Sequence, residues 1–254
     1  MKNKTVFITG ATSGIGLSSS HIFAKNGARL ILAARRADRL KKIALELTKK
    51  YNTDVLIIQL DVRDNTKVKK TVKALPKTWS EIDVLLNNAG LSRGLDKLHE
   101  GNTVDWEEMI DTNVKGLLYV SRAVIPLMVK RNKGHIINIG SIAGHEVYTK
   151  GNVYCATKHA VDAITKGMRL DLVDTNIRVT TIDPGLVETE FSLVRFRGDK
   201  NRAKSVYTGI KPLTPDDVAD AIFYAASRPD NVVIAEMLLL PNKQGSSTVV
   251  SRGS

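Results

Sequence analysis

The chain has 254 residues, of which 43% are hydrophobic, and it carries a formal net charge of +12. No apolar run approaches the roughly 20 residues needed to cross a bilayer, so we expect no membrane partner. The single cysteine, Cys155, cannot form an intrachain disulfide, which predicts a cytoplasmic location; this thiol is either a buried filler or a group near the active site.

The positive charge is spread along the chain. Lysines are distributed over several expected helices instead of forming one block with interleaved aromatic residues, so no nucleic-acid partner is predicted. The excess charge favours anionic small molecules such as a phosphorylated cofactor or a carboxylate substrate.

Strand-like runs alternate with helical patterns from end to end. Strands are expected at residues 5–9, 29–33, 55–60, 84–86, 135–139, 177–182 and 232–240. Helices are expected from the first glycine loop to residue 26 and over residues 38–51, 65–75, 104–130 and 153–173. This alternation predicts an α/β fold, a single domain over residues 1–254 with a doubly wound parallel sheet of about seven strands and helices on both faces. The irregular stretch 191–212 is a candidate substrate lid.

A glycine loop joins the first strand to the first helix. Glycines let the backbone approach a pyrophosphate, and a helix N-terminus offers free N–H groups. The loop predicts dinucleotide binding by Gly10, Thr12, Ser13, Gly14, Ile15 and Gly16.

The second strand indicates which dinucleotide is bound. It ends in Arg35 and Arg36 with no carboxylate, and guanidinium groups suit a 2′-phosphate and the adenine ring, so we predict NADP(H) over NAD(H). The alternative is that both arginines lie in a loop, face solvent and bind no cofactor. Asp61 and Val62 follow the third strand. The Asp61 carboxylate either accepts a hydrogen bond from the adenine amino group or caps the next helix. Asn88, after the fourth strand, either supports the nicotinamide half or belongs to a plain turn.

Three residues form the candidate catalytic set. Tyr154 and Lys158 are four apart on an expected helix and therefore share one face, and Ser141 follows the fifth strand. An ammonium beside a phenol lowers its pKa toward working pH, which suits a general acid/base. Ser141 would hold the substrate oxygen. The alternative for Tyr154 and Lys158 is an amphipathic surface pair.

Together these motifs resemble the short-chain dehydrogenase/reductase family over essentially the whole chain. The resemblance rests on residues 9–16, 87–90, Asn113, Ser141, Tyr154, Lys158 and the pair Pro184-Gly185. It implies a Rossmann-like fold, hydride transfer involving a nicotinamide, and a homotetramer. It further implies that Tyr154 is the acid/base, Lys158 holds the nicotinamide ribose, and Asn113 supports a proton-carrying water. Pro184, Gly185, Val187 and Thr189 would bind the nicotinamide carboxamide.

A finer resemblance concerns the substrate. The stretches 134–141, 184–192, 194–199 and 213–219 resemble the NADP-dependent serine/3-hydroxy acid dehydrogenases, which implies substrates such as serine, allo-threonine or 3-hydroxypropionate and malonic semialdehyde. Arg195 or Arg197 is the candidate for the substrate carboxylate, unless both are solvated; no metal site is predicted. The alternatives are a broad-specificity ketone or aldehyde reductase and a non-catalytic NADP-binding protein.

Overall fold

The computed structural model describes residues 1–253, which form one seven-stranded sheet with all strand pairs parallel. The strands are β1 (Thr5–Thr9), β2 (Arg29–Ala34), β3 (Val55–Gln59), β4 (Val84–Asn87), β5 (Gly134–Ile139), β6 (Ile177–Pro184) and β7 (Glu236–Leu239). Their order is β3-β2-β1-β4-β5-β6-β7, so the winding reverses between β1 and β4. In such sheets ligands bind at the carboxyl ends of the strands beside this reversal.

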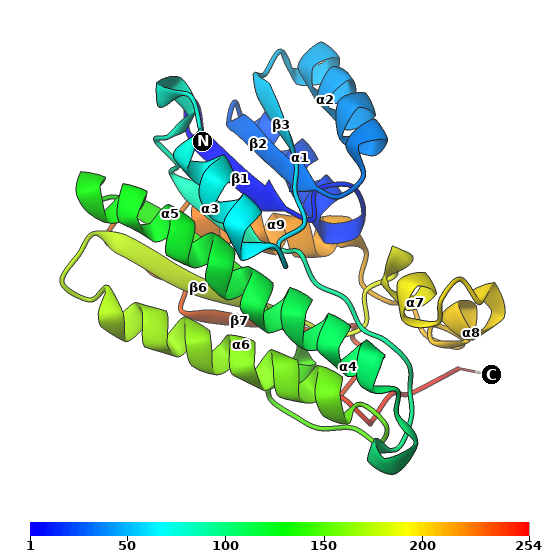
Figure 1. Ribbon diagram of the computed structural model, residues 1–254. Helices are drawn as coiled ribbons and strands as arrows, with labels where there is room; N and C mark the ends of the chain where they lie inside the picture. Colours follow the sequence, from blue (N-terminus) through cyan, green and yellow to red (C-terminus); the bar gives the residue numbers. More distant parts are fainter. Residues whose placement is uncertain (254) are drawn as a thin grey trace.

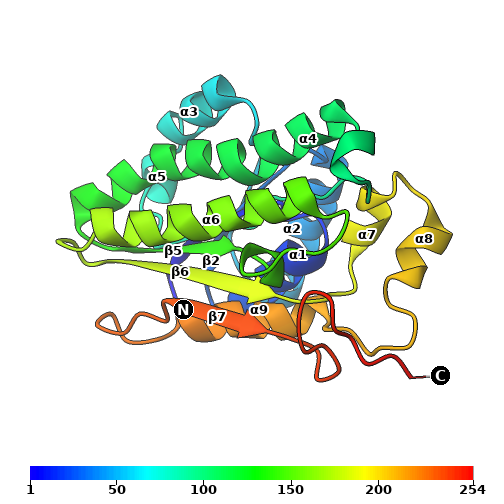
Figure 2. The ribbon, with the colours of Figure 1, turned by 90° about the horizontal axis from the view of Figure 1, so that it is seen from below.

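Helices cover both faces of the sheet (Figure 1, Figure 2). One face packs against α1 (Gly14–Lys25), α2 (Ala37–Tyr51) and α9 (Pro215–Ala226), and the other against α3 (Asn65–Lys73), α5 (Leu117–Arg131) and α6 (Asn152–Asp171). Successive strand residues alternate between the two cores: Val6 and Ile8 lie in the first core, and Phe7 in the second. β1, β2 and β4 are buried on both faces, and they are accordingly nearly continuous apolar runs. The predicted doubly wound α/β fold is confirmed.

Three parts of the chain differ from the prediction. The helix expected over residues 104–130 is divided into α4 (Thr103–Ile110), a π-helical stretch (Asp111–Gly116) and α5. Helix α9 has no counterpart among the predicted helices, and it begins with a capping box formed by Thr214 and Asp217. The stretch 191–212 contains most of α7 (Glu190–Arg195) and all of α8 (Lys200–Ser205), which project beside the sheet (Figure 1). Among residues 1–253, no helix is long and apolar enough to span a membrane.

Candidate active site

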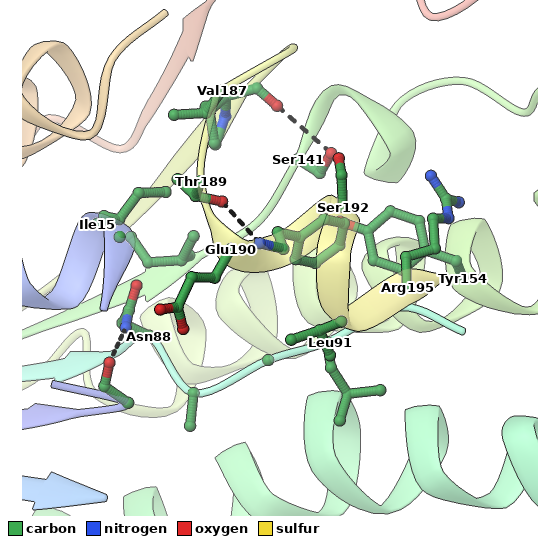
Figure 3. Close-up of a pocket in the computed structure, with 18 of the residues that line it drawn as sticks. Ile15, Asn88, Leu91, Ser141, Tyr154, Val187, Thr189, Glu190, Ser192 and Arg195 are labelled. Atoms are coloured by element: carbon green, nitrogen blue, oxygen red, sulfur yellow. Dashed lines mark hydrogen bonds between the residues drawn. The ribbon is translucent and has the colours of Figure 1, made fainter. Parts of the chain in front are cut away.

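A cavity of about 650 Å³ lies at the carboxyl ends of the strands and extends from the glycine loop to α7. Figure 3 shows Ile15 and Asn88 at one end of this cavity, and Ser141, Tyr154 and Arg195 at the other. The predicted site residues other than Gly16, Asn113 and Arg197 line it. The fold therefore brings a candidate nucleotide end and a candidate catalytic end into one cavity.

The glycine loop has the shape that a phosphate requires. Ser13 is the N-cap of α1 but makes no side-chain capping bond, which leaves the first-turn N–H groups available to an anion. Gly16 packs so closely that a Cβ there would lie 2.5 Å from Nδ2 of Asn88 and from the Gly10 carbonyl oxygen. The same Nδ2 donates to the carbonyls of Thr9, at 2.9 Å, and Gly10, at 3.2 Å. Asn88 thus holds the glycine loop against the end of β4. The loop and the available N–H groups of α1 suit the phosphates of a dinucleotide.

The two arginines after β2 differ in their surroundings. Arg36 donates to the Thr12 and Ser13 hydroxyls, both at 3.0 Å, and to Glu190 at 3.0 Å. Arg35 is exposed and lines the same cavity. A 2′-phosphate reaching this corner therefore meets one guanidinium already oriented by hydroxyl groups and a second that is accessible.

Glu190 joins α7 to this corner, a contact that no sequence pattern predicted. Its carboxylate accepts from Arg36 and, at 2.8 Å, from Arg39. Burial favours a higher pKa for Glu190, but the bonds from Arg39 and Arg36 outweigh it and lower the pKa. The segment before the candidate lid is therefore held to α2 by a paired carboxylate.

Asp61 lies in the cavity wall but is already paired. Arg63 binds its carboxylate through both Nε and Nη2, at 3.0 and 2.6 Å, and the Arg63 bonds hold the pKa of Asp61 below its ordinary value. The N-cap of α3 is Asp64, so the expectation that Asp61 caps that helix is wrong. Its role toward adenine stays a prediction, with Val62 beside it in the wall.

Ser141 and Lys158 are fixed by the end of β5. Ser141 accepts from the Ala143 N–H at 3.1 Å and donates to the Pro184 carbonyl at 3.4 Å. Lys158 is buried, and its Nζ donates to the Ile139 carbonyl at 2.8 Å; this burial lowers the pKa of Lys158 to about 8. The ammonium thus lies 5.9 Å from the centroid of the Tyr154 ring, on the same helix face.

The environment of Tyr154 differs from the expectation. Its pKa is raised, chiefly by burial and next by Tyr148, while Arg195 and a bond with Ser141 oppose the rise. Lys158 was expected to lower this pKa, yet enclosure of the phenol dominates here. At neutral pH Tyr154 is therefore a protonated phenol, the form that donates a proton.

Asn113 lies in the π-helical stretch and joins two parts of the site. Its Oδ1 accepts from the Leu91 N–H at 2.9 Å, and its Nδ2 donates to the Leu91 carbonyl and to Thr157. These bonds occupy the side-chain amide and hold the segment after β4 against α6. Short π-helical turns are frequent at functional sites. The relay role of Asn113 stays a prediction.

Arg195 and Arg197 have different partners. Arg195 lies with its guanidinium 5.5 Å from the Tyr154 ring centroid and 5.7 Å from that of Tyr148, whose hydroxyl it also bonds. Arg197 lies outside the cavity, is 59% exposed and pairs with Asp105. Of the two candidates, Arg195 is the cation beside Tyr154.

The C-terminal segment also reaches the site, which no sequence signal indicated. Gln244 accepts from the Leu186 N–H at 2.9 Å, and Ser247 donates its N–H to Glu146 at 2.7 Å. Arg252 binds the Val206 and Thr208 carbonyls beyond α8. These contacts place three residues of this segment, Gln244, Ser247 and Arg252, in the cavity wall.

Comparison with known proteins agrees with this geometry. Residues 4–198 match the family described as short chain dehydrogenase. The chain belongs to the short-chain dehydrogenase family. It is 49% identical over 253 residues to an NADP-dependent 3-hydroxy acid dehydrogenase of Schizosaccharomyces pombe, covering 99% of this chain and 98% of that protein. It is 47% identical over 240 residues to the NADP-dependent 3-hydroxy acid dehydrogenase YdfG of Salmonella typhi, covering 94% and 95%.

Solved structures agree as well. The closed form of serine dehydrogenase complexed with NADP+ superimposes with a TM-score of 0.91 at 43% identity, covering 98% of this chain and 100% of that one. An alcohol dehydrogenase from Thermococcus sibiricus complexed with 5-hydroxy-NADP superimposes with a TM-score of 0.84 at 27% identity, covering 96% of this chain and 98% of that one. The predictions of an NADP(H) cofactor and of a short-chain dehydrogenase/reductase enzyme acting on CH–OH groups are confirmed.

Substitution of Gly140 should reveal how tightly the catalytic end is packed. A Cβ at this position would fall 1.7 Å from the Asp183 carboxylate and 2.9 Å from the Thr181 hydroxyl. We expect Gly140→Ala to destabilise the protein by about 1–3 kcal/mol, as overpacking does. Gly167→Ala in α6 is the control: it has no neighbour within 4 Å, and in a helix alanine is favoured over glycine by up to about 1 kcal/mol. Urea unfolding measures both, and equal stabilities would contradict the packing argument.

Proposed function

We propose that this enzyme interconverts small 3-hydroxy acids and the matching carbonyl acids with NADP(H), for example serine, allo-threonine or 3-hydroxypropionate and malonic semialdehyde. The observation that carries the proposal is the position of Arg195, whose guanidinium lies beside the Tyr154 ring inside the cavity. A substrate carboxylate bound in this cavity would be stabilised by such a cationic partner through a charge-assisted hydrogen bond. The names of the relatives support the same substrate class.

In the direction of carbonyl reduction, the chain's residues have distinct proposed roles. Ser141 and Tyr154 donate hydrogen bonds to the substrate oxygen, and Tyr154 transfers the proton as alkoxide charge develops. Lys158 holds the nicotinamide ribose, and residues of the loop from Pro184 to Thr189 hold the carboxamide. When bound, the reduced nicotinamide supplies the hydride. We propose Asn113 as the start of a proton path to solvent.

The lid and the assembly are further parts of the proposal. We propose that residues 191–212, which include α8, cover the bound substrate and that Arg195 approaches it from this segment. We also propose a cytoplasmic homotetramer. An assembly is supported by exposed apolar side chains on or just after α5 and α6, since subunit contacts cover such surfaces. These side chains are Leu118, Val129, Leu170 and Val173. Sedimentation equilibrium would report the number of subunits.

Arg195→Met is expected to raise KM for 3-hydroxy acids roughly ten- to a hundredfold, because the substrate loses a charge-assisted bond. It should change turnover of a carboxylate-free ketone far less. The measurement is NADPH oxidation or NADP+ reduction at 340 nm with L-serine, L-allo-threonine, 3-hydroxypropionate, malonic semialdehyde and the ketone. Arg197→Met is the matched control because Arg197 lies outside the cavity.

This panel also distinguishes the alternatives. Equal losses on acids and on the ketone would remove the carboxylate role of Arg195. Wild-type turnover of the ketone alone would favour a broad-specificity ketone or aldehyde reductase. Binding of NADPH with no turnover of any carbonyl would favour a non-catalytic NADP-binding protein.

A further inference from the structure

The Arg195 guanidinium is held in the cavity wall by two hydrogen bonds. Its Nε donates to the Gly94 carbonyl at 3.2 Å, and its Nη2 donates to the Tyr148 hydroxyl. Within residues 1–253 the guanidinium makes no other hydrogen bond, so Nη1 stays available to a ligand in the cavity. The place of this cation therefore depends on the segment that contains Gly94.

That segment is bonded to the C-terminal end of α7. The Gly94 N–H donates to the Arg195 carbonyl at 3.1 Å, so Gly94 bonds both the backbone and the side chain of Arg195. Gly94 has a φ of 60°, which favours glycine, and a Cβ there would lie 2.6 Å from the Asp96 carboxylate. One residue earlier, Arg93 donates from Nη1 to the Val194 carbonyl. The last carbonyls of a helix need such donors from outside the helix.

Arg93 is itself oriented by a carboxylate of α4. Its Nε and Nη2 donate to the two oxygens of Glu108, at 2.7 and 3.2 Å, and the two side chains are only 15% and 19% exposed. The bonds from Arg93 hold the pKa of Glu108 below its ordinary value and outweigh the effect of burial. A bidentate pair of this kind fixes orientation as well as charge. Arg93 does not line the cavity, so it reaches the site through α7.

We propose that Arg93, oriented by Glu108, is a positioning residue that fixes the C-terminal end of α7 and thereby places Arg195 where it receives the carboxylate of a 3-hydroxy acid. The inference rests on the proposed function, because it requires Arg195 to bind that carboxylate. Without the Arg93 bonds, Arg195 keeps its charge but loses its fixed position. Acids should then bind less tightly, while the proton and hydride steps are unchanged.

The first test compares substrates with and without a carboxylate. Arg93→Met should raise KM for L-serine and 3-hydroxypropionate by roughly three- to tenfold, less than Arg195→Met does, and should leave kcat within about twofold. Both constants for the carboxylate-free ketone should stay within about twofold of wild type. Glu108→Gln keeps the side-chain shape and serves as a second variant if Arg93→Met folds poorly; it should shift KM for the acids in the same direction by less. Equal losses on the acids and the ketone would overturn the proposal.

Arg131→Met is the matched control. Like Arg93, Arg131 is a partly buried arginine that bonds a main-chain carbonyl, that of Ile82, and pairs with carboxylates, those of Glu81 and Asp83. It lies outside the cavity, so its loss should leave the acid-to-ketone ratio of kcat/KM unchanged. A change in this ratio as large as that in Arg93→Met would mean that loss of any such arginine moves it, and the positioning role would fall.

A double-mutant cycle tests whether Arg93 acts through Arg195. Once residue 195 carries no guanidinium, there is no cation left to position. Adding Arg93→Met to Arg195→Met should therefore change KM for the acids by less than about twofold. A rise by the same factor in both backgrounds would show that Arg93 acts by another route and would refute the inference.

A measurement without substrate separates this inference from the proposed function. The Nε–H of Arg195 donates to Gly94, and its NMR signal can be assigned by its loss in Arg195→Met. Arg93→Met should speed the exchange of this proton with solvent several-fold, and Arg131→Met should not. An unchanged exchange rate in Arg93→Met would overturn the positioning role. Faster exchange in a protein whose Arg195→Met variant keeps the wild-type KM for acids would support the positioning of Arg195 while its proposed carboxylate role fails.

Discussion

Tyr154→Phe is expected to lower kcat/KM for carbonyl reduction by roughly 10²- to 10⁴-fold, the usual contribution of a positioned general acid. The change removes only the hydroxyl. The ring should keep its edge contact with Phe191, 5.6 Å between centroids, and its position beside Arg195. Since the structure keeps Tyr154 protonated at neutral pH, the lost function in this direction is proton donation to the substrate oxygen.

The measurement pairs steady-state kinetics with the NADPH dissociation constant. The affinity for NADPH should remain within a few-fold of the wild-type value, because the conformation of the glycine loop does not depend on the phenol. Tyr148→Phe is the matched control: it deletes a phenol in the same cavity that bonds Arg195, so it should affect KM for acids more than the proton step. Near-normal turnover in Tyr154→Phe would contradict the assignment of the acid.

The parts of the site that the sequence predicted are those specified locally. The glycine loop, the Tyr154–Lys158 spacing and Ser141 each depend on one strand end or one helix face, so residue type and spacing suffice. The central strands could be predicted equally well from the sequence, because burial on both faces makes β1, β2 and β4 nearly continuous apolar runs. The resemblance to the family added Asn113 and the loop after β6, which no local pattern specifies.

The rest depends on contacts between distant residues. Glu190 reaches Arg36 across 154 positions, and Gln244 reaches Leu186 across 58. Arg63 pairs with Asp61 only two residues away, but spacing alone did not show that this pair would form. Spacing left Arg195 and Arg197 as alternatives for the substrate carboxylate. The local backbone distinguishes them: Arg195 ends helix α7, and Arg197 follows with a φ of 52°, which turns it away. The π-helical stretch around Asn113 was likewise missed, since its residues continue a helical apolar pattern.

Replacing both Arg35 and Arg36 by Gln should weaken NADPH binding by roughly a hundredfold while NADH binding changes only a few-fold. A guanidinium–phosphate bond contributes about 1.5–3 kcal/mol, and only NADPH carries the 2′-phosphate. The structure predicts different single effects. Arg35→Gln removes an accessible cation alone, whereas Arg36→Gln also removes the bonds that Arg36 donates to Thr12, Ser13 and Glu190. The Arg36 variant should therefore also reduce the affinity for NADH slightly.

Calorimetric titration with NADPH, NADH, 2′,5′-ADP and 5′-AMP separates the phosphate contribution from that of the remaining nucleotide. Arg39→Gln is the matched control, because Arg39 bonds Glu190 and does not line the cavity, so we expect its NADPH affinity to stay within a few-fold of wild type. If the double variant lost NADPH and NADH affinity equally, the two arginines would not recognise the phosphate. The next candidates for a preference for NADP(H) would then be the loop hydroxyls of Thr12 and Ser13, which line the same cavity and which Arg36 already orients.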